Sequence, residues 1–186
     1  EITWRLQQKL VRPWPGGGPD AYTGWTVSVK GKRIAIGSGG DGGSYPGSGA
    51  ITLFQSKSGA RGTWELVLDE FGGAFFEYFG NPIIQNEKYM TAWRKRANPG
   101  ITVYNLSTNT SVFLGAEELA RLENPESGEN PPIPYPLGFG TQFIWYADKI
   151  LISAPGLASE FDSGGVLGQV YIFDAPTEPE TFRRRR

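Results

Sequence analysis

One group of side chains that could bind a ligand is Trp93-Arg94-Lys95-Arg96, in which three cations directly follow a tryptophan. Arginine can hold a carboxylate or a phosphate through two parallel hydrogen bonds, and the neighbouring indole could lie against a sugar ring. This segment is the best candidate for binding an anion or a glycan. The alternative, which the pattern alone favours, is a solvated loop that carries an aromatic plug.

Two glycine-rich loops carry carboxylates at corresponding places in the chain. Residues 38–48 contain Asp41, and residues 160–165 contain Asp162. The first loop could hold an anion through its backbone N–H groups, but no Lys-Ser/Thr pair of a P-loop follows it. The two aspartates could share a metal ion. Two isolated carboxylates are weak metal ligands, so we expect flexible, solvated surface loops at both places.

The chain contains no histidine and no cysteine. These absences exclude disulfides, thiol nucleophiles, the Ser-His-Asp triad and nearly every zinc site. The formal net charge of −1 gives no electrostatic reason to expect a nucleic-acid partner. No apolar stretch approaches the ~20 residues of a membrane-spanning helix. We therefore predict a non-catalytic protein with no catalytic residues and no resident cofactor.

The segments that must position these side chains are three copies of one unit. Each copy begins with a glycine beside an aromatic residue, at Gly24, Gly80 and Gly140, so the repeat is 56 and then 60 residues long. An apolar run reaches its end 13 residues after each glycine. A second apolar run then closes on an aromatic side chain; these closing residues are Phe54, Tyr104 and Phe173. Repeats of this length are typical of propellers and solenoids.

Each copy is predicted to be a series of short strands, which makes the fold class all-β. The predicted strands are 25–29, 33–37, 50–54 and 64–68 in the first copy, 89–93, 101–104 and 111–114 in the second, and 150–155 and 169–173 in the third. The runs 33–37, 89–93 and 150–155 are apolar on both faces. This pattern predicts that they are buried between neighbouring sheets.

The third copy resembles the FG-GAP repeat of integrin-alpha-type β-propellers. Phe139-Gly140 stands for the FG signal, residues 153–155 for the GAP signal, and residues 168–173 for the Gly-x-Val-Tyr-x-Phe closing strand. The first copy keeps Gly24-Trp25 and a closing strand that ends in Phe54. The second copy keeps Phe79-Gly80 but carries Trp93-Arg94-Lys95 where the GAP signal is expected. The resemblance implies a β-propeller of four-stranded blades over most of residues 1–176.

The resemblance divides the chain into blades and connections. The expected parts are an outer strand at 1–12, a first blade at about 24–69, a second at about 79–114, an insertion at 115–137 with a short helix in 115–122, a third blade at about 138–174, and a polar basic tail at 177–186. Three blades fall short of the usual four to eight. Either the remaining blades lie elsewhere in a larger propeller, or a second copy completes a six-bladed dimer.

The resemblance to this family implies a secreted or cell-surface protein. Its expected function is a non-catalytic interaction or assembly module that binds a protein or glycan partner through blade-top loops. One alternative is the propeller fragment of a secreted hydrolase, such as a glycosylphosphatidylinositol-specific phospholipase D, with its catalytic domain on another segment. Another alternative is a small oligomeric lectin. Two N-glycosylation sequons, at Asn105 and Asn109, agree with a secretory route.

Calcium binding is common in the family but is not expected from this chain. Many members carry an Asp-rich loop between the first two strands of a blade. Here the corresponding positions are short turns around Gly31, Glu87 and Asp148. Such turns offer too few oxygen atoms for the six to eight ligands that calcium takes.

Overall fold

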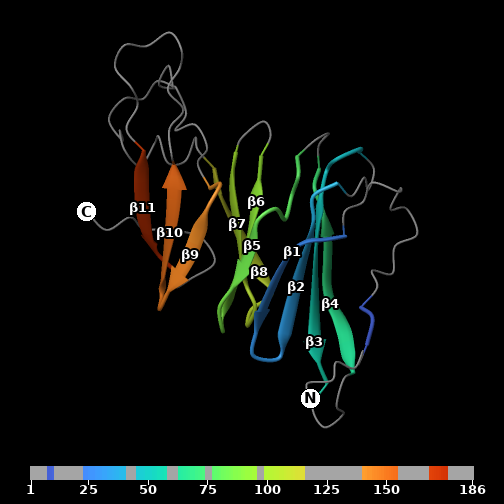
Figure 1. The fold of residues 1–186 in the computed structure, drawn as a ribbon. Helices are drawn as coiled ribbons and strands as arrows, with labels where there is room; N and C mark the ends of the chain where they lie inside the picture. The colour runs from blue at the N-terminus through green and yellow to red at the C-terminus, as the bar shows by residue number, and fades with distance from the viewer. Residues whose placement is uncertain are drawn as a thin grey trace, which may run out of the picture.

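The computed structural model describes residues 8–10, 23–40, 45–57, 63–73, 77–95, 99–115, 140–154 and 168–175. Within these ranges the chain forms three antiparallel sheets of three or four strands, which lie face to face in an open stack (Figure 1). The prediction of an all-β chain is confirmed. The predicted strand at 1–12, helix at 115–122 and tail at 177–186 fall almost entirely outside the described residues.

In each sheet, strands that follow one another in sequence are neighbours. The first sheet contains β1 (Thr23–Lys30), β2 (Arg33–Ser38), β3 (Ala50–Ser56) and β4 (Trp64–Phe71). The second contains β5 (Ile83–Gln85), β6 (Tyr89–Arg94), β7 (Gly100–Asn105) and β8 (Thr110–Gly115). The third contains β9 (Phe143–Tyr146), β10 (Lys149–Ala154) and β11 (Gln169–Asp174). The strands predicted from the repeat all form.

The three repeat glycines share one backbone conformation. Gly24, Gly80 and Gly140 have φ angles of 88°, 86° and 80°, in the left-handed region that glycine enters without steric cost. The N–H of Gly80 donates to the carbonyl of Trp93 at 3.0 Å, and the N–H of Gly140 donates to that of Ser153 at 2.9 Å. The spacing of 13 residues therefore marks a hairpin, whose opening glycine pairs with the end of the second strand.

Apolar side chains fill the space between the first and second sheets. The buried members of this cluster are Ala35, Ile51, Leu53, Phe79, Ile83, Met90, Ala92 and Tyr104. The backbones also approach closely. A β-carbon on Gly37 would overlap the carbonyl oxygen of Gly80, and that same oxygen accepts a hydrogen bond from the Thr26 hydroxyl at 2.8 Å. The absence of a side chain at Gly37 thus lets the two sheets touch.

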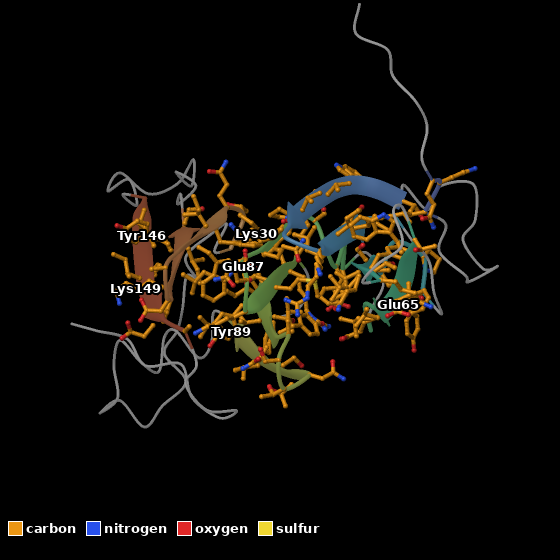
Figure 2. The ribbon with its side chains drawn as sticks, turned by 90° about the horizontal axis from the view of Figure 1, so that it is seen from below. Lys30, Glu65, Glu87, Tyr89, Tyr146 and Lys149 are labelled. Carbon is orange, nitrogen blue, oxygen red and sulfur yellow. The ribbon has the colours of Figure 1, made fainter. Side chains whose placement is uncertain are left out.

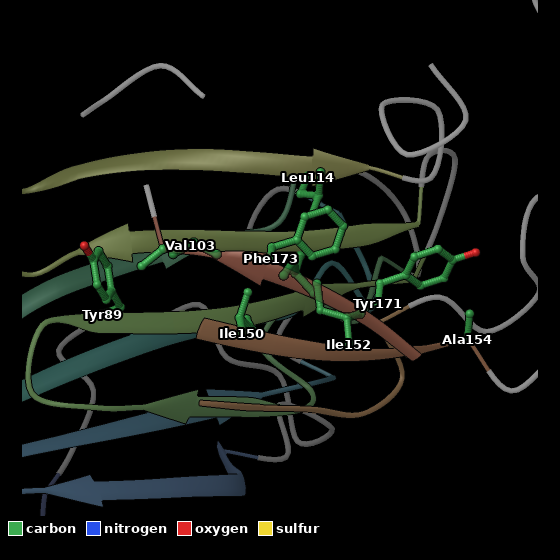
Figure 3. Packing of buried hydrophobic residues seen from close by; sticks show 10 residues of the cluster. Tyr89, Val103, Leu114, Ile150, Ile152, Ala154, Tyr171 and Phe173 are labelled. Carbon is green, nitrogen blue, oxygen red and sulfur yellow. The ribbon is translucent and has the colours of Figure 1, made fainter. Parts of the chain in front are cut away.

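A second apolar cluster joins the second and third sheets (Figure 3). Its buried members are Tyr89, Ile101, Val103, Leu114, Ile150, Ile152, Ala154, Tyr171, Phe173 and Ala175. The ring of Trp145 stacks on that of Tyr89, with centroids 5.0 Å apart. The middle sheet is therefore covered on both faces, whereas within the described ranges each outer sheet has a neighbouring sheet on one face only.

Burial of the second strand of each sheet follows from this arrangement. The first four residues of β6, in the middle sheet, are all buried, as predicted for an apolar run. Along β2 and β10, buried and half-buried residues alternate over much of the strand. The prediction of burial on both faces is therefore right for β6 and wrong for β2 and β10. The reason is that no described sheet packs on the outer face of the first or third sheet.

The two ends of the stack differ. Contacts that link Gly37 to Gly80, Gly80 to Trp93 and Gly140 to Ser153 bring the carboxyl ends of β2, β6 and β10 to one end, at the top of Figure 1. We call this the loop end. The short turns that connect β1 to β2, β5 to β6 and β9 to β10 lie at the opposite end, which we call the turn end.

Candidate binding site at the loop end

Arg94, the last residue of β6, lies at the loop end, and its side chain contacts residues of both the first and the second sheet. Its guanidinium donates to a carboxylate oxygen of Glu77 at 2.8 Å and lies 3.5 Å from a carboxylate oxygen of Glu70, at the end of β4. The Nε atom donates to the Thr102 hydroxyl at 3.1 Å. The same guanidinium covers the ring of Phe79, 4.1 Å from its centroid. Arg94 therefore joins the first and second sheets.

The carboxylates around Arg94 are poorly exposed. Glu77 is buried, and Glu70 is only partly exposed. A buried carboxylate is tolerated when an opposite charge and hydrogen bonds compensate for its lost hydration. Arg94 provides this compensation, so the cluster of Arg94, Glu70, Glu77 and Tyr104 is an internal polar contact between the sheets. We call it the Arg94 cluster.

The surroundings of Tyr104, which closes β7, strongly shift the pKa of its hydroxyl. Its hydroxyl donates to Glu70 at 2.8 Å. Burial raises the pKa of Tyr104 well above its usual range, the negative charge of Glu70 raises it further, and Arg94 acts in the opposite direction. Tyr104 is therefore a neutral hydrogen-bond donor at physiological pH and not an acid or a nucleophile.

The raised pKa of Tyr104 predicts a loss of stability in alkali. In the unfolded chain this tyrosine loses its proton near pH 10, whereas the folded chain still holds it there. The stabilisation is complete below about pH 10, and above it the free energy of unfolding falls by about 1.4 kcal/mol per pH unit. Urea unfolding between pH 8 and about pH 11 measures this slope. Tyr104→Phe should remove this fall in the free energy of unfolding above about pH 10, whereas Tyr146→Phe, at an exposed position, should leave it unchanged. Equal pH slopes for the two variants would contradict the assignment of the fall to Tyr104.

The other residues of the sequence-predicted cation segment lie in different surroundings. Trp93 is partly buried and packs against the core between the second and third sheets, where Gly140 leaves room for its ring. Lys95 is exposed, with its ammonium group 5.1 Å from the ring centroid of Tyr78. Arg96 lies outside the described residues. The segment therefore does not present three free cations: Arg94 turns inward, whereas Lys95 faces solvent beside an aromatic ring.

The structure does not describe the two residues predicted as possible metal ligands. Asp41 and Asp162 both lie outside the described residues. The turns around Gly31, Glu87 and Asp148 are tight hairpins. Among the residues that the structure describes, no group of three or more acidic, histidine or cysteine side chains could hold a metal ion.

Both predicted glycosylation sites lie on the β7–β8 hairpin at the turn end, where the N–H of Leu106 donates to the carbonyl of Lys88 at 2.8 Å. Asn109 is exposed and has a left-handed φ of 56°. The side-chain oxygen of Asn105 accepts hydrogen bonds from the N–H groups of Ser107 and Thr108, so this amide shapes the turn. Of the two, Asn109 is the more accessible to a modifying enzyme.

The turn end also carries ionic contacts between and within sheets (Figure 2). Lys30 lies 3.8 Å from Glu87 of the second sheet, and the Arg33 guanidinium donates to the backbone carbonyl of Glu87 at 2.9 Å. In the third sheet, Lys149 pairs with Asp174 at 2.6 Å. The Lys30–Glu87 pair is largely exposed, so we expect it to contribute little to stability.

Sequence reasoning missed the partners of Arg94, because Glu70 and Glu77 are separated from it along the chain and belong to no motif. It also missed two contacts between sheets. The side-chain amide of Gln85 donates to the carbonyl of Ser28 at 2.7 Å, and the indole of Trp145 donates to the Thr91 hydroxyl at 3.0 Å. Gln85 and Trp145 are each the fifth residue after a repeat glycine. That shared position was the signal that could have identified them.

No model of a known protein family matches the chain, and no curated protein matches it either. Within the described ranges, no helix has the length and apolar character needed to span a membrane.

Proposed function

We propose that the three sheets are blades of an FG-GAP-type β-propeller, and that the chain is a non-catalytic interaction or assembly module. In this proposal it acts outside the cell or at the cell surface, and its loop end binds a protein or glycan partner. The observation that carries the proposal is the shared geometry of the three sheets. Each has a left-handed repeat glycine within or shortly before its first strand, and each directs its second strand to the same end of the stack.

This geometry favours binding at the loop end. The turns from the first to the second strand of each sheet, at the turn end, have two or three residues, whereas residues 39–49, 95–99 and 155–168 link the second strand to the third at the loop end. Variable loops on a rigid sheet scaffold are where binding residues are usually found. The absence of histidine and cysteine supports a binding role over a catalytic one.

The chemistry of the loop end favours an anionic or sugar-containing partner. Arg94 is occupied by Glu77 and Glu70, so its guanidinium stabilises the scaffold. Lys95 remains exposed over the ring of Tyr78 and combines a cation with an aromatic face. Such a pair suits a carboxylate, a phosphate or an acidic sugar. Asn109 lies at the turn end, so a glycan there would leave the proposed binding end uncovered.

The test is binding of the fluorescently labelled chain to a glycan array and to the surface of cultured animal cells. We expect saturable binding that Lys95→Glu weakens at least about tenfold, a loss of roughly 1.4 kcal/mol. Lys88→Glu is the matched control, because Lys88 is an exposed lysine at the turn end and its replacement should leave binding unchanged. Absence of saturable binding on both surfaces, or equal losses for the two variants, would contradict the proposal.

A further inference from the structure

The outer face of the third sheet has the character of an interior face. The two alternate residues before each closing aromatic are equivalent in the three sheets. In the first two sheets these residues are at most 2% exposed; they are Ile51 and Leu53, and Ile101 and Val103. Their equivalents in β11, Val170 and Ile172, are 65% and 48% exposed. In the first and second sheets, the face that carries these residues packs on the next sheet in sequence, so we call it the leading face.

The apolar character of this leading face extends across all three strands of the sheet. Ile144 of β9 pairs with Leu151 of β10, and Leu151 pairs with Ile172 of β11. The three side chains therefore form one aliphatic row across the sheet, and Ile144 is also exposed. Such a continuous exposed apolar row is a typical feature of a binding surface.

The opposite face of the first sheet is open in the same way. In the second and third sheets, the third and fifth residues after the repeat glycine pack on the preceding sheet; they are Ile83 and Gln85, and Phe143 and Trp145. Their equivalents in β1, Val27 and Val29, are 56% and 64% exposed. They pair with Ile36 and Ile34 of β2. We call this the trailing face.

The exposed leading face of the third sheet and the exposed trailing face of the first sheet are therefore complementary, because they are the two kinds of face that pack together between sheets within the chain. Inside the chain, a leading face packs on a trailing face twice, once between the first and second sheets and once between the second and third. The leading face of the third sheet and the trailing face of the first sheet each lack a described sheet as partner. A second copy supplies both missing faces at once.

We propose that two copies of this chain associate, with the leading face of each third sheet packed on the trailing face of the partner's first sheet. The two contacts are identical, so the pair has twofold symmetry and closes into a ring of six sheets. Six lies within the usual range of four to eight blades, whereas one copy provides three and three copies would provide nine. The inference depends on the propeller arrangement but not on any partner at the loop end.

The test uses the whole chain and two substitutions, which introduce a positive charge on the leading face and a negative charge on the trailing face. Light scattering after size exclusion, at tens of micromolar, should give twice the 20.4 kDa of one chain. Ile172→Lys on the leading face and Val27→Glu on the trailing face should each give a folded monomer. Both positions are exposed in the single chain, so folding, checked by circular dichroism, should survive. Phe113→Lys is the matched control: this residue is 41% exposed on β8 of the covered middle sheet, and the dimer should persist.

Mixing the two monomeric variants provides the decisive result. In a mixed pair, one contact joins two unaltered faces and the other places lysine opposite glutamate, so the dimer should return. A monomeric or aggregating wild-type chain, an open-ended polymer, or a dimer that resists both substitutions would overturn the inference. A monomer that still binds a glycan array or a cell surface would do so while leaving the proposed function intact.

Discussion

Phe173→Ala lowers the free energy of unfolding by about 4 kcal/mol, which is the expected cost of removing a fully buried phenylalanine. The side chain of Phe173 has no exposed surface and lies in the core between the second and third sheets (Figure 3). Its removal leaves a cavity next to Ile150 and Ile152, in the core that joins these two sheets. Urea unfolding followed by tryptophan fluorescence measures the loss.

The matched control is the same substitution at an exposed site. Phe113 on β8 is partly exposed, so Phe113→Ala should cost no more than about 1.5 kcal/mol. Equal losses for the two variants would show that the core between the second and third sheets is not packed as described. A large loss confined to Phe173→Ala supports the face-to-face packing on which the propeller proposal depends.

Arg94→Ala is expected to cost about 3 to 5 kcal/mol, the range for breaking a buried ion pair by removal of one partner. The substitution removes the guanidinium that pairs with the buried carboxylate of Glu77 and the hydrogen bond to Thr102. The double variant Arg94→Met and Glu77→Gln should recover part of the loss, because it removes both charges of this pair. Urea unfolding of the single and double variants measures both effects.

The control for Arg94 is an ion pair on the surface. Lys57 lies 3.2 Å from Glu65, and both side chains are about half exposed. Lys57→Ala should therefore change the free energy of unfolding by no more than about 0.5 kcal/mol. If Arg94→Ala instead abolished partner binding and left stability unchanged, the guanidinium would be a ligand-binding group and not a contact between sheets.

Local sequence was sufficient to predict the described strands except the short β5 and β9, for which no residue range was predicted. Alternating or continuous apolar runs separated by glycine-rich turns are specified by side-chain periodicity, a property of neighbouring residues. The repeat also identified Gly24, Gly80 and Gly140, whose shared left-handed conformation is a local backbone requirement. The all-β class and the repeated hairpins were therefore predictable from the chain alone.

The candidate site was less predictable, because charge at a sequence position does not reveal what faces it. Trp93-Arg94-Lys95 reads as one cationic segment, but alternation along a strand sends neighbouring side chains to opposite faces. Trp93 consequently enters one core, and Arg94 meets carboxylates on the other side of its sheet. Glu77 and Glu70 precede Arg94 by 17 and 24 residues and share no motif with it.

The sequence by itself determined most of the strands, the hairpin glycines and the apolar residues available for burial, because each depends on chemistry within a few residues. Only the tertiary structure decided which of those apolar residues are covered. Ile101 and Val170 occupy equivalent positions in the repeat, yet one is buried and the other exposed. The difference arises because Ile101 belongs to a sheet with neighbours on both faces, whereas no described sheet covers the outer face of the sheet that contains Val170.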